Sequence, residues 1–512
     1  MKNSKQVIYK IYDKLVYLIE IIISMLIGIA AYKTAYQYRD LNYISKIYVT
    51  IIAILLLILL AIIILNTKRY KEKIEKLFLT YIIPIGIMFT ILFPAYWSPD
   101  EVWHMVKTYD ISVGHIITPL GEENRGDIYV PAEMIELEEE SKNFNYSKIH
   151  QILQTRTDYN NLVQVQTVAK TYAPINYLPG AVTFFICRHL NINILLACYI
   201  VKLINFLLFA IIGYFCIKML PVGKLLMAIY MLLPMVIQQS ATLSADSFIN
   251  GAAMLFIAYN LKLIYQDKDL DLKQKIFYYV LAFSIALSKY IYFPLSFMSL
   301  LLIKNKNISK KNRNELIIIS LCLSLFTSVA WFLFSQQYAE LREFIIQRNV
   351  QPIEQIKYIL YHPITYIKIF IDTLIANSGY YLFTFVGQEL GALNIKLPQI
   401  YGLIEIFALA LLPIFEKNDK ALQKYSKWAL NIIAIIMIGL ILTGLYLTWT
   451  PIGEKQISGV QGRYFVPVFI LILLTLIDKD KNIKVKNLEI KYFLLYFILN
   501  ILSLKVVFSI FL

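Results

Sequence analysis

Charged side chains are scarce in this sequence. Asp, Glu, Lys and Arg make up 16% of its 512 residues, against 58% hydrophobic residues. A soluble globular domain carries about 25% charged residues and shorter apolar runs. The low charge therefore excludes an ordinary soluble domain of this length.

Cysteine pairs and the common catalytic motifs are missing as well. All four cysteines lie inside apolar segments and form no C-x-x-C pair, so neither a disulfide framework nor a thiolate metal site is indicated. The sequence contains no phosphate-binding P-loop, no H-E-x-x-H and no G-x-S-x-G. Four of the histidines share no ligand spacing: His115, His150, His189 and His362.

Long apolar runs are abundant. Ile51–Leu65 contains no polar side chain, and Ala429–Leu447 is nearly as apolar. A helix of roughly 20 such residues crosses a hydrocarbon core of about 30 Å, and strand-like alternation is absent. We therefore expect an all-α polytopic membrane protein. Thirteen spans are predicted, near residues 15–35, 47–66, 75–94, 195–217, 222–240, 247–264, 275–289, 290–304, 314–335, 399–416, 428–449, 464–478 and 491–511.

These spans divide the chain into an N-terminal two-span hairpin, residues 1–74, and a main transmembrane domain, residues 75–512. Two long polar stretches, residues 95–193 and 336–398, are predicted to be external loops. An apolar segment near residues 181–190 is too short to span and is expected to lie in the membrane interface, although re-entry or one more short span would also fit.

Basic residues predict the orientation. The net charge is +15, and 29 of the 49 Lys and Arg residues fall in the N-terminus and in alternate short loops. Cytoplasmic loops are enriched in Lys and Arg, which also touch anionic lipid headgroups. We therefore expect a cytoplasmic N-terminus, contacts with membrane lipids and no nucleic-acid partner. Arg39 and Lys46, in the first external loop, run against this bias.

The segment Ser98–His104, just after the third predicted span, carries the sharpest polar signal. Ser98, Pro99 and Glu101 suit a helix start, and the acids also complement the helix dipole. Helix capping does not explain His104, which shares a helix face with Asp100 four residues earlier. A carboxylate and an imidazole at a membrane boundary can take a proton from a hydroxyl or hold a metal.

Two further polar residues lie at predicted external ends of spans. Asp246 is costly near a membrane core, and it is either a helix cap or part of a site. Lys289 is a lone cation that either extends its ammonium to the interface or binds an anion.

The segment Ser458–Pro467 precedes the twelfth predicted span. Gly459 and Gly462 flank Gln461 and permit close backbone approach, and Arg463 offers a planar guanidinium suited to phosphate oxygens. Tyr464 follows directly. An external arginine opposes the charge bias, which favours phosphate contact over a topology signal. We expect Asp100 and Arg463 to meet across a shared cavity at the outer leaflet.

In these motifs the chain resembles the bacterial membrane proteins of domain-of-unknown-function family 2142, within the GT-C glycosyltransferase superfamily. The resemblance runs from about residue 75 to the C-terminus and is most specific in its last motif. The matching stretches are Ser98–His104 with Gly114, Tyr172–Pro179, Ser244–Asp246, Leu287–Lys289, Phe385–Gly387 with Leu397–Pro398, and Gly459–Tyr464.

The resemblance implies a GT-C-like bundle with a large first external loop. It also implies transfer of a sugar from a polyprenyl phosphate to a cell-surface glycan or protein acceptor outside the bacterial cytoplasmic membrane. Asp100 would be the base or metal ligand, supported by Glu101 and His104, with Mg²⁺ or Mn²⁺ as a candidate cofactor. Asp246, Lys289, Gln461, Arg463 and Tyr464 would bind the substrate. Two alternatives remain open: a transporter or flippase of lipid-linked saccharides, and a non-catalytic polysaccharide-assembly protein.

Overall fold

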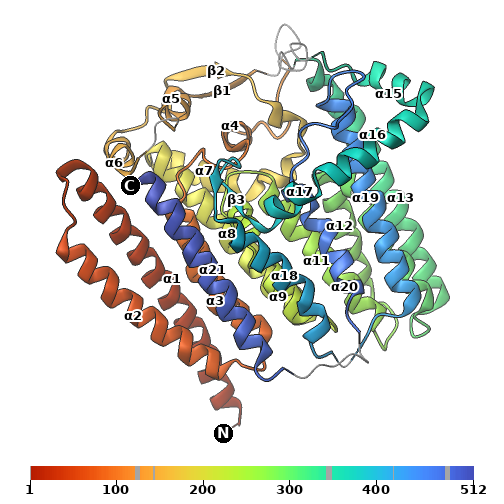
Figure 1. Ribbon diagram of the computed structural model, residues 1–512, viewed down its shortest axis with the longest axis horizontal. Coiled ribbons are helices and arrows are strands. Elements are labelled where there is room, and N and C mark those ends of the chain that lie inside the picture. Colours follow the sequence, from red (N-terminus) through yellow and green to blue (C-terminus); the bar gives the residue numbers. More distant parts are fainter. Residues whose placement is uncertain (1, 121–126, 142–144, 342–348, 419, 479–484) are drawn as a thin grey trace.

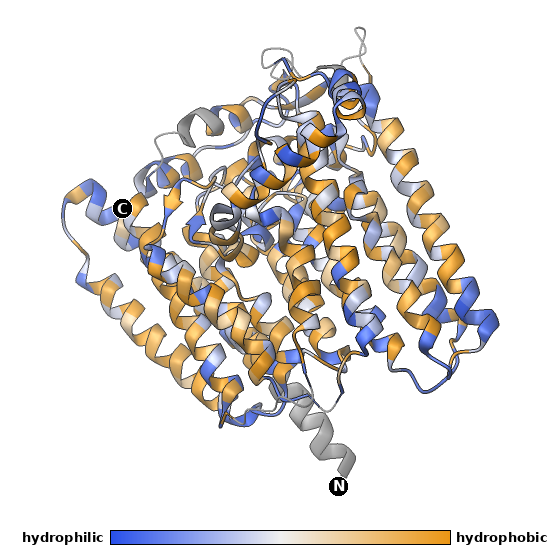
Figure 2. Cartoon of the chain, turned by 45° about the vertical axis from the view of Figure 1, so that its right-hand side comes forward, coloured by the Kyte–Doolittle hydropathy of each residue, from blue (hydrophilic) through white to orange (hydrophobic). Residues whose placement is uncertain are grey.

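Long apolar helices dominate the computed structural model (Figure 1). The structure describes residues 2–120, 127–141, 145–341, 349–418, 420–478 and 485–512. In this part of the chain, eight helices are long and apolar enough to cross a membrane, which confirms the membrane class. They are α1 (Lys2–Leu41), α2 (Lys46–Arg69), α3 (Ile74–Leu92), α8 (Ile194–Met219), α11 (Asp246–Ile264), α13 (Lys310–Ser335), α19 (Lys424–Thr448) and α21 (Leu488–Phe511). Hydrophobic residues cover these helices, and polar residues gather at their ends (Figure 2).

Thirteen spans are not confirmed, because eight described helices qualify by length and composition, or nine if the bent pair α15 (Pro352–Tyr361) and α16 (Pro363–Ala376) counts as one span. Five predicted spans are shorter elements, and residues 222–240 form two helices, α9 (Lys224–Tyr230) and α10 (Pro234–Ser240). The helix is interrupted before Pro234, because proline lacks the backbone N–H that continues a helix. The other four are α12 (Leu272–Ser288), the 3₁₀ segment η3 (Tyr290–Lys304), α18 (Gln399–Phe415) and α20 (Val466–Thr475). Sequence hydropathy detects apolar segments but not these interruptions.

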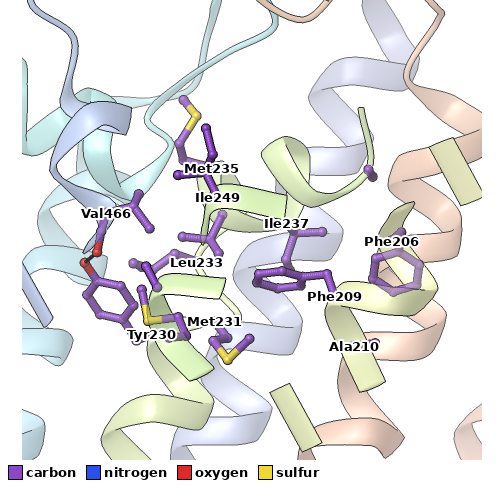
Figure 3. Close-up of a cluster of buried hydrophobic side chains, with 14 of the residues drawn as sticks. Phe206, Phe209, Ala210, Tyr230, Met231, Leu233, Met235, Ile237, Ile249 and Val466 are labelled. Carbon is purple, nitrogen blue, oxygen red and sulfur yellow. Dashed lines mark hydrogen bonds between the residues drawn. The ribbon is translucent and has the colours of Figure 1, made fainter. Parts of the chain in front are cut away.

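The centre of the bundle is close-packed. Phe206 and Phe209 of α8 pack near Ile237 of α10, and Tyr230 at the end of α9 donates a hydrogen bond of 2.7 Å to the Val466 carbonyl (Figure 3). At Gly86 of α3 an added Cβ would overlap the ring of Phe206. Small residues of this kind let membrane helices approach closely, so packing in place of a hydrophobic effect holds the bundle together.

The N-terminal hairpin lies against the main bundle. The Tyr17 hydroxyl donates to the Lys76 carbonyl at 3.0 Å, and Gly28 of α1 faces Ile91 of α3. Asn66 of α2 donates to the buried carboxyl of Glu20 at 2.8 Å, a polar contact that joins the two hairpin helices.

Several loops that the charge pattern assigns to the cytoplasm meet at one end of the bundle, here called the loop face. Gly223 N–H donates to Asn418 at 2.9 Å, Tyr265 donates to the Ala421 carbonyl at 2.7 Å, and Asn305 donates to the Leu263 carbonyl at 2.9 Å. Hydrogen bonds between loops far apart in sequence fix this end of the bundle.

The opposite end, here called the site face, carries most of the two predicted long loops. The first loop contains α4 (Glu101–Ser112), α5 (Ala132–Ser141), α6 (Tyr146–Gln154), α7 (Leu178–His189), η1 (Val168–Thr171), η2 (Pro174–Tyr177) and the antiparallel pair β1 (Ile128–Pro131) and β2 (Leu162–Val165). The second contains η4 (Gln336–Leu341), α15 (Pro352–Tyr361), α16 (Pro363–Ala376), α17 (Ser378–Val386) and the pair β3 (Glu389–Leu390) and β4 (Ile395–Lys396). The fold is thus largely helical, with two very small sheets. The apolar segment near 181–190 lies in α7, which is too short to span; its place in the interface stays a prediction.

Candidate functional site

One guanidinium links two carboxylates on the site face. Arg463 Nη2 lies 3.0 Å from Asp100 Oδ2, and Arg463 Nη1 lies 3.0 Å from Asp246 Oδ2. The arginine side chain is 4% exposed, Asp246 is 14% exposed and Asp100 is 55% exposed. Asp100 and Arg463 are therefore in direct contact, and Asp100 is the most exposed of the three side chains. That they share a cavity at the outer leaflet stays a prediction.

Close backbone approach positions Arg463. The residue lies in the 3₁₀ turn η5 (Gly462–Phe465), where the Gly462 N–H donates to Thr384 Oγ1 at 2.9 Å. A Cβ at Gly462 would overlap the Tyr381 carbonyl oxygen and the Phe385 nitrogen, so only glycine fits. Arg463 Nε also donates to Gln461 Oε1 at 2.6 Å. Gln461 thus fixes the guanidinium plane that faces the two acids.

Glu101 connects the two acidic turns and does not face the arginine. Its carboxylate accepts the Ser98 N–H at 3.2 Å and the Leu243 N–H at 3.1 Å. Leu243 lies three residues before Asp246, the first residue of α11. Both carboxylate oxygens of Glu101 are therefore occupied by backbone donors, and the side chain is buried. The bond from the Ser98 N–H is the one that the Ser98–Glu101 spacing predicts for a helix start, whereas the bond from the Leu243 N–H is visible only in the fold. The geometry gives Glu101 a positioning role.

Asp246 is held at the first turn of α11 by a polar chain. Gln239 Nε2 donates to Asp246 Oδ2 at 3.0 Å, and Asn250 Nδ2 donates to Gln239 Oε1 at 3.1 Å. The positive end of the helix dipole also favours a carboxylate here. Gln239 was not among the predicted site residues, because an amide in an apolar segment gives no catalytic signal of its own.

Lys289 and a group of tyrosines form the next part of the site. Lys289 Nζ lies 4.7 Å from the centre of the Tyr464 ring and 5.3 Å from that of Tyr292. The Tyr292 hydroxyl donates to the Tyr464 carbonyl at 2.9 Å, and Asn176 Nδ2 donates to the Ser288 carbonyl at 2.9 Å. The ammonium is thus placed by aromatic faces and by backbone contacts on both sides.

His104 lies behind the charged residues, in an aromatic setting. Its Nδ1 is 2.6 Å from the Tyr177 hydroxyl, and its ring packs edge-on against Tyr172 at 5.1 Å. Burial lowers the pKa of His104 to about 4, and the nearby carboxylates of Asp100 and Asp246 only partly oppose this shift. The imidazole is therefore neutral at pH 7. The two tyrosines, in the Tyr172–Pro179 segment, were not predicted as site residues.

The candidate metal ligands do not converge. No group of three His, Cys, Asp or Glu side chains with metal-binding geometry occurs in the described part of the chain. Glu101 accepts hydrogen bonds from two backbone N–H groups, and one carboxylate oxygen of Asp100 accepts a hydrogen bond from Arg463. This donor set does not fit a divalent cation held jointly by Asp100, Glu101 and His104. The arrangement of two cations and two carboxylates fits an anionic ligand that exchanges partners with the acids.

The fold and this site define a class: a polytopic α-helical membrane protein with a buried arginine that forms ion pairs with two carboxylates at one end of its bundle. The family model described as predicted membrane protein (DUF2142) matches residues 84–472. The chain belongs to this family. The match contains every residue of the charged site, whereas α1 and α2 lie outside it. No curated protein and no solved structure matches the chain.

Proposed function

We propose that the protein is a membrane glycosyltransferase of the GT-C type. It transfers a sugar from a polyprenyl phosphate to an acceptor hydroxyl on a surface glycan or protein outside the bacterial cytoplasmic membrane. One observation supports this above the others: Arg463 holds Asp100 and Asp246 at 3.0 Å each, with a second cation, Lys289, nearby. Such a site can bind a phosphate and present a carboxylate to a hydroxyl.

The reaction assigns the two charge types different tasks. Asp100 accepts the acceptor hydroxyl proton while that oxygen attacks the anomeric carbon. The bond between this carbon and the phosphate oxygen breaks, and its electron pair leaves with the polyprenyl phosphate. Arg463 and Lys289 neutralise the charge that develops on the leaving phosphate, where preorganised cations stabilise the transition state most.

The ion pairs imply an order of binding. An arriving phosphate competes for the Arg463 guanidinium and releases Asp100, which is the more exposed partner. The released carboxylate can then face the acceptor hydroxyl while the donor is already in place.

The orientation supports an extracytoplasmic site. The loop face carries the basic loops that the positive-inside rule assigns to the cytoplasm. The site face, at the other end of the bundle, would then lie outside. A donor whose phosphate sits in the membrane surface requires no nucleotide-binding fold.

The test is sugar transfer by the purified protein in nanodiscs, supplied with a panel of undecaprenyl-phosphate sugars and surface-glycan acceptors. We expect release of undecaprenyl phosphate, lost on Asp100→Asn and on Arg463→Gln. Asp267→Asn and Arg156→Gln, which alter exposed residues outside the site, serve as controls. Movement of the intact lipid-linked saccharide between leaflets without bond cleavage would show a flippase. Full surface-glycan assembly by both site variants in cells would show a non-catalytic role.

A further inference from the structure

The helices α15 and α16 expose a stripe of isoleucines. Ile364 of α16 is 83% exposed, and the exposed stripe continues along the same face. The buried residues of the two helices are Gln355, Ile369 and Thr373, and charged residues such as Lys357 and Lys368 lie on the exposed side beside the isoleucines. A helix that faces only water carries few isoleucines on its exposed face. The exposed isoleucines of these two helices are Ile353, Ile356, Ile364, Ile367, Ile371 and Ile375.

This helix pair packs against the end of a candidate membrane span. The two helices together are apolar enough for a span, but they meet at an angle of 108°. The Tyr366 hydroxyl lies 2.6 Å from Thr443 Oγ1, and its ring packs on Tyr446 at 5.2 Å. Thr443 lies five residues before the end of α19 at Thr448, or about 7 Å at 1.5 Å per residue. The bend therefore packs beside the last turns of a membrane span.

The same helices lead to the charged site. Thr373 Oγ1 of α16 accepts the Ile457 N–H at 3.1 Å, just before the arginine motif. The next helix, α17, supplies the backbone against which Gly462 packs. Tyr380 of α17 is 39% exposed and lies within electrostatic reach of Arg463 and Tyr464. The isoleucine helices and the charged site are therefore connected through α17 and through the contact between Thr373 and Ile457.

We propose that the α15–α16 bend lies in the same leaflet as the site and seats the hydrocarbon chain of a single-chain lipid phosphate, whose phosphate binds Arg463 and Lys289. This inference rests on the lipid-phosphate donor of the proposed function and assigns its chain to a surface. The isoleucine stripe fits a hydrocarbon occupant, because contact with a lipid chain removes this exposed apolar area from water. Arg463 and Lys289 of the charged site complement a phosphate.

Binding of two probes of different chain length tests the inference. The triple variant Ile367→Ser, Ile371→Ser and Ile375→Ser should weaken the binding of undecaprenyl phosphate by on the order of tenfold, because each lost apolar contact removes part of about 0.8 kcal/mol per buried CH₂ group. Binding of geranyl phosphate, whose chain is too short to reach the stripe, should stay unchanged. Native mass spectrometry of the protein in nanodiscs measures both affinities.

The matched control variant changes three exposed isoleucines of α19: Ile432→Ser, Ile435→Ser and Ile436→Ser. It should bind both probes like the parent protein. Unchanged undecaprenyl phosphate binding in the α16 variant, or equal loss of both probes, would overturn the inference. Phosphatidic acid competing as strongly as undecaprenyl phosphate would overturn the assignment to a single-chain carrier.

A nitroxide label gives a measurement that does not depend on the proposed reaction. A label at position 371 should be relaxed more by oxygen than by a water-soluble nickel complex, whereas the reverse result would place the bend in water and overturn the inference. If the protein binds lipid phosphates in a chain-length-dependent way but transfers no sugar, the proposed function is wrong and the binding of the hydrocarbon chain at the α15–α16 bend still holds. The two failures are therefore distinguishable.

Discussion

Asp100→Asn and Asp246→Asn each remove one carboxylate from Arg463, and their effects on stability should be unequal. The Asp100 side chain is 55% exposed, and Asp246 is 14% exposed. An exposed ion pair contributes about 0–1 kcal/mol, whereas removing one partner of a buried pair costs about 3–5 kcal/mol. We expect Asp100→Asn to change the free energy of unfolding by less than about 1 kcal/mol and Asp246→Asn to lower it by about 3 kcal/mol.

Double-mutant cycles with Arg463→Gln isolate the pairwise terms. The coupling energy between positions 246 and 463 should be about 2–3 kcal/mol, and that between positions 100 and 463 should stay below about 1 kcal/mol. Reversible unfolding of the purified protein in mixed detergent micelles measures both. Asp267→Asn, on an exposed loop residue, should leave the free energy of unfolding unchanged.

The effects of the two substitutions on sugar transfer should not follow their effects on the free energy of unfolding. Asp100→Asn should abolish transfer although it hardly affects stability, because it removes the base but not a buried counterion. A coupling energy at Asp100 equal to or larger than that at Asp246 would refute the assignment of the exposed acid to chemistry and the buried acid to structure.

Three further changes test how the site is held. Gly462→Ala should lower the free energy of unfolding by about 2 kcal/mol, because the new Cβ overlaps the backbone of α17, whereas Gly439→Ala, with open space at its Cβ, should not destabilise; equal effects would refute the close-approach argument. Glu101→Ala should cost about 2 kcal/mol or more by leaving two backbone N–H groups unpaired, while the exposed control Glu136→Ala should be neutral in the same unfolding assay. Because burial lowers the pKa of His104 to about 4, from about 6.5 when unfolded, the unfolded state binds more protons between these values, so stability should fall by up to about 3 kcal/mol as the pH drops from 6.5 to 4. Unfolding measured against pH should show this slope, and His104→Phe should flatten it; an unchanged slope would remove His104 as its source.

The membrane class and the residues of the charged site could be found from the sequence. In lipid, the backbone N–H and C=O groups of an uninterrupted apolar run can form hydrogen bonds only with one another, so helices follow directly from composition. Asp100, Asp246, Lys289 and Arg463 stood out because charge beside a membrane core is costly and requires a reason. The number of long spans could not be found in the same way, since hydropathy does not detect the interruption before Pro234 or the 3₁₀ turns of η3.

By itself the sequence determined that this is a helical membrane protein with its basic loops and its polar motifs at different ends of the spans, because local composition controls partition into lipid. Only the tertiary structure decided which of those polar residues meet. Arg463 is 363 residues from Asp100, and no local pattern encodes a contact over that distance. The fold likewise turned Glu101 away from the arginine, because its carboxylate accepts the backbone N–H groups of Ser98 and Leu243. It also brought Tyr172 and Tyr177 into contact with His104.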